Sequence, residues 1–140
     1  MMELELIHEN AFATARYDRK NKVLHASYEG IFNTELTQEN FEVIISKLSD
    51  YPLRGGVFNC LNMKGTFTKL NSWLNEVWYP AIVPQGYVCW SMATNDVFTQ
   101  FAANLLINKL TPKEITAKMF GSLEKAEQWT YNFLEQKELA

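Results

Sequence analysis

The stretch Val57-Phe58-Asn59-Cys60-Leu61 decides the fold, because it is a short apolar run placed directly after Gly55-Gly56. An apolar run of this length next to a glycine pair is typical of a β-strand that is covered on both faces. Strands of this kind occur in layered α/β folds, where helices pack on both sides of a mostly parallel sheet. The stretch therefore predicts an α/β fold and places a strand inside it.

Upstream of this strand, the sequence predicts a β-hairpin and then a helix. Residues 11–17 and 23–28 are strand-like, and the polar residues 18–22 between them favour a turn. Gly30 ends the second strand, and Asn33 or Thr34 can cap a helix. The apolar positions of that helix fall on one face; they are Thr37, Phe41, Ile44, Ile45 and Leu48.

Downstream, the pattern alternates between helices and strands. Residues 62–68 read as a loop, and residues 71–79 as a short helix that Pro80 ends. A strand over 87–94 precedes a helix capped by Asp96, and its apolar stripe consists of Val97, Phe98, Phe101, Ala102, Leu105 and Leu106. A last strand over 115–120 precedes a final helix, which Ser122 caps.

The predicted element order is β-β-α-β-α-β-α-β-α. Helices between successive strands imply right-handed crossovers and hence parallel pairing. We therefore expect a mostly parallel five-stranded sheet with an antiparallel opening hairpin. We expect residues 1–140 to form one domain, with its core over about 11–134, because the sequence has no repeat, linker or low-complexity segment.

Composition excludes several classes of protein. With 47% hydrophobic residues among 140, the chain has enough apolar material for a core and is not disordered. The net charge of -3 argues against a nucleic-acid binder that relies on a basic surface. No apolar run approaches the roughly 20 residues of a membrane span, and the first ten residues do not resemble a signal peptide. We expect a cytoplasmic protein.

Residues suited to catalysis are scarce. His8 and His25 are the two histidines, and neither belongs to a metal-binding motif. Cys60 and Cys89 lie in apolar runs and are expected as core thiols without a disulfide, although a thiol enzyme pairing one of them with His25 is the rival hypothesis. Glu76 is expected on a solvated helix position rather than as a general base. Glycine-rich phosphate-binding motifs are absent, so the sequence predicts no metal, no cofactor and no catalytic residue.

Aromatic residues are dense between Phe67 and Trp90. The predicted helix over 71–79 carries apolar residues on two neighbouring faces, because Trp73 and Val77 are four apart, as are Leu74 and Trp78. One face can cover the sheet, and the other needs a second cover. Three explanations stay open: all the rings complete one core, the chain forms a homodimer through Trp73 and Trp78, or a lipid-like ligand covers them. Among possible partners, we expect a second copy of the chain.

The element order and three local sequences resemble the STAS fold, and within it the SpoIIAA-like family. These sequences are Tyr28-Glu29-Gly30-Ile31, the strand at 57–61 with its Gly65-containing loop, and Met119-Phe120-Gly121-Ser122-Leu123-Glu124-Lys125-Ala126-Glu127-Gln128-Trp129. The resemblance covers residues from about 11 to 134. It implies a non-catalytic regulatory module that binds proteins, as anti-sigma-factor antagonists do. A similarity in shape to lipid-binding SEC14 or CRAL-TRIO domains suggests an apolar ligand as the alternative.

The resemblance also implies where binding takes place. In anti-sigma-factor antagonists, a serine in the loop after the third strand is phosphorylated; here that loop lacks the acidic residue of the motif, and its hydroxyls are Thr66 and Thr68. Phosphate there would meet helix N–H groups and Lys64 or Lys69. We expect the loop and helix at the carboxyl end of a central strand. The expected partner- or ligand-binding residues are Lys64, Gly65, Thr66, Phe67, Trp73, Val77, Trp78, Tyr79 and Trp90.

Overall fold

A single twisted sheet organises the molecule. In the computed structural model, which describes residues 2–96, 99–100, 104 and 111–139, six strands lie side by side in the order β1-β2-β3-β4-β5-β6. The pairs β1·β2 and β2·β3 are antiparallel, and the pairs from β3 to β6 are parallel. The bounds are β1 Glu5–Glu9, β2 Ala13–Asp18, β3 Val23–Ile31, β4 Gly55–Lys64, β5 Cys89–Ala93 and β6 Thr116–Phe120. The mixed α/β fold and its antiparallel opening hairpin are as predicted.

The sheet has one more strand than the five predicted. β1 was missed because its sequence Glu-Leu-Ile-His-Glu buries one apolar side chain, Ile7, while the neighbouring Leu6 is 52% exposed. A strand at the edge of a sheet has only one neighbouring strand, so its sequence needs no strong apolar alternation. Charged residues and a bulge on such a strand discourage pairing with other chains. The register of β1 against β2 does shift between Leu6 and His8, as such a bulge requires.

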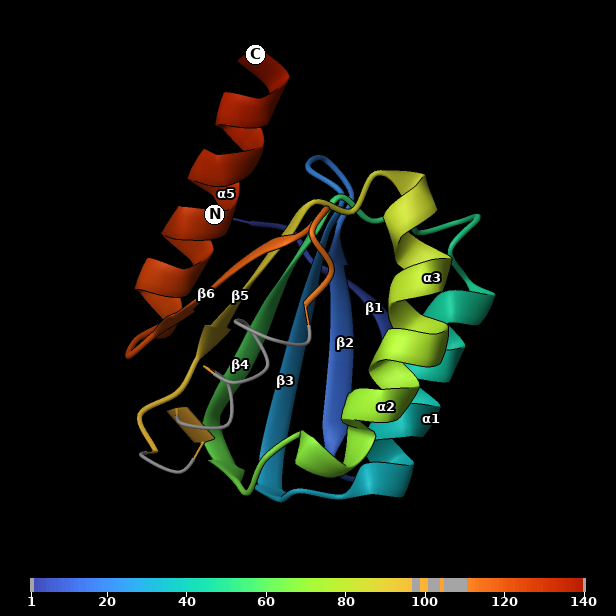
Figure 1. Ribbon diagram of the computed structural model, residues 1–140, viewed down its shortest axis with the longest axis vertical. Helices are drawn as coiled ribbons and strands as arrows, with labels where there is room; N and C mark the ends of the chain where they lie inside the picture. Colours follow the sequence, from blue (N-terminus) through green and yellow to red (C-terminus); the bar gives the residue numbers. More distant parts are fainter. Residues whose placement is uncertain (1, 97–98, 101–103, 105–110, 140) are drawn as a thin grey trace.

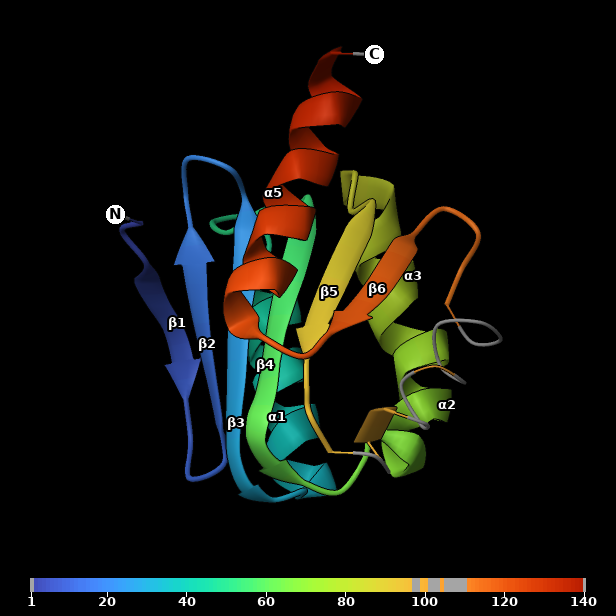
Figure 2. The same cartoon turned by 90° about the vertical axis from the view of Figure 1, so that its left-hand side faces the viewer.

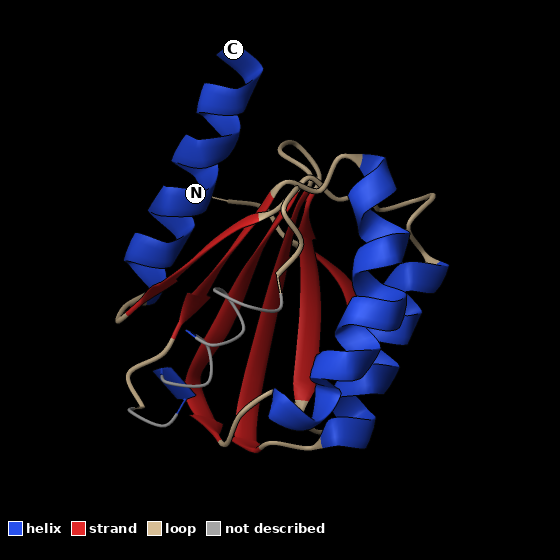
Figure 3. Ribbon diagram, viewed as in Figure 1, coloured by secondary structure: helices blue, strands red, loops and turns tan. Residues whose placement is uncertain are grey.

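Helices cover both faces of the sheet (Figures 1 and 3). The helix α1 (Thr34–Ser46) and a helical run over 68–85 lie on one face, and α5 (Leu123–Leu139) lies on the other. The predicted caps of α1 and α5 are confirmed. Leu36 N–H donates to Asn33 Oδ1 at 2.8 Å, and Lys125 N–H donates to Ser122 Oγ at 3.2 Å. None of the helices in the described ranges is long and apolar enough to cross a membrane.

The helical run after β4 corrects the prediction that a helix over 71–79 ends at Pro80. It consists of η1 (Thr68–Leu70), α2 (Asn71–Trp73), the π-turn η2 (Leu74–Trp78), α3 (Tyr79–Ile82) and η3 (Val83–Gln85). Pro80 stands in the first turn of α3, where a missing N–H is tolerated. The wide π-turn that precedes Pro80 shifts the helical register. The helix therefore continues past the proline.

Most of the predicted helix after Asp96 lies outside the described residues, and so does the apolar stripe from Val97 to Leu106 that the sequence assigns to it. Its expected cap is within them. Asp96 Oδ1 accepts a hydrogen bond from Thr99 N–H at 3.0 Å, the geometry of an N-cap. The cap therefore agrees with the prediction.

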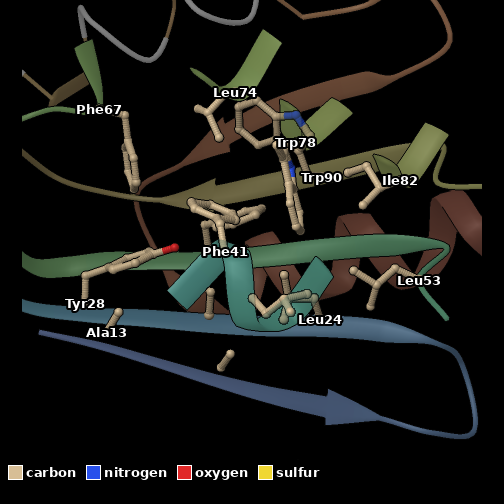
Figure 4. Close-up of a cluster of buried hydrophobic side chains, with 14 of the residues drawn as sticks. Ala13, Leu24, Tyr28, Phe41, Leu53, Phe67, Leu74, Trp78, Ile82 and Trp90 are labelled. Atoms are coloured by element: carbon tan, nitrogen blue, oxygen red, sulfur yellow. The ribbon is translucent and has the colours of Figure 1, made fainter. Parts of the chain in front are cut away.

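Two apolar layers flank the sheet. The larger one fills the space between the sheet and the helices α1 to α3, and Figure 4 shows its centre, with Phe41, Trp78 and Trp90 turned toward one another. The smaller one lies under α5 and contains Val57, Cys89 and Leu134. Residues 57–61 thus form part of a strand that is covered on both faces, as predicted.

Candidate functional site

The predicted loop lies at the carboxyl end of a central strand. Residues Asn62 to Lys64 still belong to β4, so the strand is longer than the predicted 57–61. The end of β3 runs beside it: Phe32 N–H donates to Lys64 O at 2.8 Å, and Ile31 is in register with Lys64. Gly65 follows with φ +110°, a conformation that residues with a side chain rarely adopt, and an added Cβ would lie 3.0 Å from Phe32 Cβ. The glycine lets the chain turn sharply away from the strand.

The two candidate phosphorylation sites, Thr66 and Thr68, lie at the start of this turn. Their hydroxyl oxygens are 2.8 Å apart, and Thr68 N–H points to Thr66 Oγ1 at 3.4 Å. Thr68 is exposed, and so are Lys64 and Lys69 on either side of the pair. The position of this loop is as predicted, and phosphorylation stays a prediction.

The helix over 71–79 leaves this edge. It begins beside the end of β4 and runs back along the sheet towards the start of β5, as Figure 1 shows. The prediction that the whole helix lies at the carboxyl edge is therefore wrong for its second half. The reason is topological: the segment connects two parallel strands, so it must return to the opposite edge of the sheet.

Most of the aromatic residues in the predicted site are core residues. Phe67, Trp78, Tyr79 and Trp90 are each at most 7% exposed. The Trp78 ring lies 4.6 Å from that of Phe41, centroid to centroid, and the half-buried Trp73 packs against Phe41 from the next turn. Four expected binding residues thus have no surface to offer, and the second face of the helix is covered by α1 of the same chain. Val77, 41% exposed, is the apolar residue that the helix presents to solvent.

This burial bears on both explanations that gave the aromatic helix a binding role. Trp78 cannot form a dimer contact without leaving the core, so a dimer through this helix would rest on Val77 and the edge of Trp73. The cavity lined by Phe41, Phe58, Phe67, Leu74, Trp78 and Trp90 has a volume of about 30 Å³. One water occupies about 10–15 Å³ on this measure, so the cavity holds about two waters and no lipid chain.

The rival thiol enzyme is not assembled. Cys60 lies in the larger core layer, whereas His25 lies on the opposite face of the sheet, where its Nε2 is 2.8 Å from Tyr131 Oη of α5. Cys89 shares that face but is separated from His25 by the whole width of β4. Both cysteines are free and buried, and burial raises the pKa of Cys89 to about 12 and that of Cys60 further. A nucleophilic thiol needs the opposite shift.

Two further predictions concern acids and metals. Glu76 is exposed on the helical run, which is the solvated position that the sequence predicts. Among the residues that the structure describes, no three His, Cys, Asp or Glu side chains are placed to hold a metal ion.

Ile31 is a surface residue that the sequence analysis did not select. Its side chain is 79% exposed at the end of β3, directly beside Lys64. We use the term carboxyl-edge surface for Ile31, Lys64, Gly65, Thr66 and Thr68. The sequence carries no local signal for this exposure, because whether a helix covers Ile31 depends on how α1 and α5 pack on the sheet.

Comparisons with known proteins support the fold and nothing finer. No family model matches the chain, and no curated protein matches it. The chain is similar to the crystal structure of an uncharacterized protein of the DUF3478 family with a SpoIIAA-like fold, from Shewanella loihica PV-4. The two share 14% sequence identity over 92% of this chain and 93% of that one, with a TM-score of 0.53. The chain therefore has a SpoIIAA-like fold of the STAS type, as its sequence predicts.

Proposed function

We propose that this protein is a non-catalytic regulatory module that binds another protein through the carboxyl-edge surface. The observation that carries the proposal is the exposure of Ile31, 79% for a large apolar side chain at the end of a central strand. Burying such a side chain against a partner contributes about 1.5–3 kcal/mol. Open α/β sheets bind their ligands at this edge.

The surroundings of Ile31 suit a protein partner. Lys64 is an exposed cation in register with Ile31, and Lys69 is exposed in the η1 turn that follows. An apolar centre with charged neighbours is the arrangement of an interface with an apolar core and a polar rim. We expect the partner to present an apolar pocket flanked by acidic residues. Phosphate on Thr66 or Thr68 would reverse the local charge and weaken that contact, which gives the module a means of control.

The fold and the chemistry of its cysteines favour a non-catalytic role. The SpoIIAA-like fold is typically non-catalytic. In this chain the cysteines are buried with raised pKa values, and Cys60 and His25 lie on opposite faces of the sheet. Such thiols are poor nucleophiles, so the fold supports binding better than chemistry.

The test uses a photo-crosslinking amino acid at position 31, introduced while the protein is produced in its own cells. The matched control places the same group at Leu139, which is 82% exposed at the far end of α5. We expect one adduct of defined mass at position 31 that is missing at position 139 and is lost in Lys64→Glu. Identical adducts at both positions, or none at position 31, would contradict the proposal.

A further inference from the structure

A cleft opens beside α5, on the face of the sheet opposite the aromatic core. A hollow of about 350 Å³ lies between the first turns of α5 and the strands β2, β3 and β4. A second hollow of about 660 Å³ shares Met2, Leu123 and Glu127 with the first, so the two are continuous. We call them together the α5 cleft. The cleft exists because α5 packs on β4, β5 and β6 and leaves β1 and β2 uncovered (Figure 2).

Polar side chains without partners converge on this cleft. Arg16, Ser27 and Glu127 line it, and the structure gives their side chains no hydrogen bond or ion pair within the described part of the chain. The other two arginines differ: Arg19 binds Glu5 at 2.7 Å, and Arg54 binds Glu138 at 2.6 Å. Arg16 is thus the arginine whose charge is left for a ligand.

Asn59 and His25 each offer one remaining polar atom. Asn59 Oδ1 accepts from Leu61 N–H at 3.2 Å, which leaves the Nδ2 donor. Burial raises the pKa of Asp18, but hydrogen bonds to its carboxylate lower the pKa by more, so the group is ionised. Asp18 Oδ2 accepts a hydrogen bond from the Tyr131 hydroxyl at 2.7 Å. Tyr131 Oη must then accept from His25 Nε2–H at 2.8 Å. The neutral imidazole is left with Nδ1 as an acceptor.

His25 and Glu127 are partly shielded from water, whereas Arg16 stands at the exposed rim of the cleft. Burial lowers the pKa of His25 to about 4, so the ring is neutral at pH 7. Burial and the nearby Glu124 raise the pKa of Glu127. A partly buried carboxylate such as Glu127 interacts more strongly with a ligand cation than the same group on an open surface.

The charges in the cleft restrict what can bind. Arg16 and Glu127 line the same hollow, but their charged atoms are not within 4 Å of each other, since they form no ion pair. A ligand with only a negative charge would be repelled by Glu127, and one with only a positive charge by Arg16. A molecule that carries both charges, with an apolar part for Leu4 and Leu123, satisfies every group.

We propose that the α5 cleft binds a free apolar α-amino acid. Arg16, Ser27 and Asn59 Nδ2 bind its carboxylate, and Glu127 and His25 Nδ1 bind its ammonium group. Leu4 and Leu123 contact its side chain. The hollow that Arg16 and Glu127 line, about 350 Å³, lies within the roughly 300–1,000 Å³ of small-molecule sites. This inference goes beyond the proposed protein interaction and uses the opposite face of the molecule, so either can fail alone.

The test is an NMR titration of the whole chain with L-leucine, L-methionine and L-phenylalanine up to about 10 mM, where even a weak millimolar site saturates. We expect saturable shifts of the amide signals of residues 16, 25, 27, 59 and 127. Two matched compounds separate the charges: 3-methylbutylamine lacks the carboxylate of leucine, and 4-methylpentanoate lacks its ammonium group. We expect each to bind at least tenfold more weakly.

Matched variants then locate the site. Arg16→Gln and Glu127→Gln should each weaken binding at least tenfold, whereas Lys113→Gln and Glu135→Gln, which remove exposed charges elsewhere, should leave it unchanged. The proposal is overturned if none of the three amino acids gives saturable shifts, or if the shifts map elsewhere. Equal affinity for 4-methylpentanoate would overturn the role of Glu127.

Discussion

The two faces of the sheet are held together by different means. On the face of α1 to α3, large rings bury one another: Trp78 makes a tilted contact with Phe41 and an edge-to-face contact with Tyr87. On the α5 face the buried side chains are smaller, and hydroxyl groups join helix to sheet. Ser91 Oγ donates to Ala126 O at 2.9 Å and also lies 2.7 Å from Thr130 Oγ1. Tyr131 bridges Asp18 and His25.

This difference explains which face is free to bind small molecules. An apolar core packs to nearly crystal density and leaves little room, here a cavity of about 30 Å³. A polar face needs partners for its groups, and where α5 does not reach, those partners must be water or a ligand. The aromatic residues that drew attention in the sequence therefore stabilise the fold, while the open polar face has the chemistry for a ligand.

The largest effect should come from the aromatic face. Trp78→Ala should lower the free energy of unfolding by about 3–5 kcal/mol, because it removes a side chain that is 2% exposed and packed on Phe41. Urea denaturation followed by circular dichroism measures this. Val77→Ala, one residue away and exposed, should change stability by less than about 0.5 kcal/mol. Similar effects for the two variants would contradict the assignment of Trp78 to the core.

The α5 face should respond to pH through His25. Its pKa falls from 6.5 to about 4 on folding, so the unfolded chain binds the proton more tightly. The resulting stability is complete above pH 6.5 and is lost as the pH falls towards 4, by about 3 kcal/mol at most. Unfolding free energies at pH 7 and 4 should differ less in His25→Gln than in wild type. His8→Gln is the control, and equal pH dependence in all three proteins would refute the idea.

A smaller effect should follow from removing one hydroxyl of the α5 face. Tyr131→Phe leaves Asp18 without one donor and His25 Nε2–H without an acceptor, which should cost about 1–3 kcal/mol. Chemical denaturation at pH 7 measures the loss. Tyr51→Phe is the matched control, because the structure gives the Tyr51 hydroxyl no hydrogen bond within the described residues. If Tyr131→Phe lowered the free energy of unfolding no more than Tyr51→Phe does, the hydrogen bonds of Tyr131 would contribute nothing to stability.

The smallest effect on stability should come from Val77→Asp, which is also the sharpest test of dimer formation. The exposed position should tolerate the charge within about 0.5 kcal/mol. If the chain associates through this helix, as we propose from its sequence, sedimentation velocity should show a dimer for wild type and a monomer for the variant. A monomeric wild type, or a dimer that survives the charge, would exclude this contact.

The elements that could be predicted are those fixed by residues close together in the sequence. Asn33 and Ser122 cap helices as expected, and the apolar residues of β4 lie between two layers, because caps and burial periodicity act over a few residues. The strand β1 was missed because an edge strand does not require alternating apolar side chains. The continuation of the helix past Pro80 was missed because a π-turn, fixed by packing, lets the proline start a new register.

The candidate sites divide in the same way. The loop at 64–68 could be placed from the sequence, since the carboxyl ends of parallel strands share one edge. Its aromatic neighbours could not be separated into core and surface, because Trp73, Val77 and Trp78 have the same helical spacing whether α1 covers them or not. Residues of the α5 cleft come from β2, β3, β4 and α5 and share no motif.

The sequence by itself determined the α/β class, the opening hairpin and the helix caps, because these depend on the order of residues and on contacts between near neighbours in the chain. Only the tertiary structure decided that Trp78 is buried, that Ile31 is exposed and that Arg16 and Glu127 line one hollow. The physical reason is that burial and charge pairing depend on which helix covers which strand. In this molecule that is set by where α1 and α5 pack on the sheet.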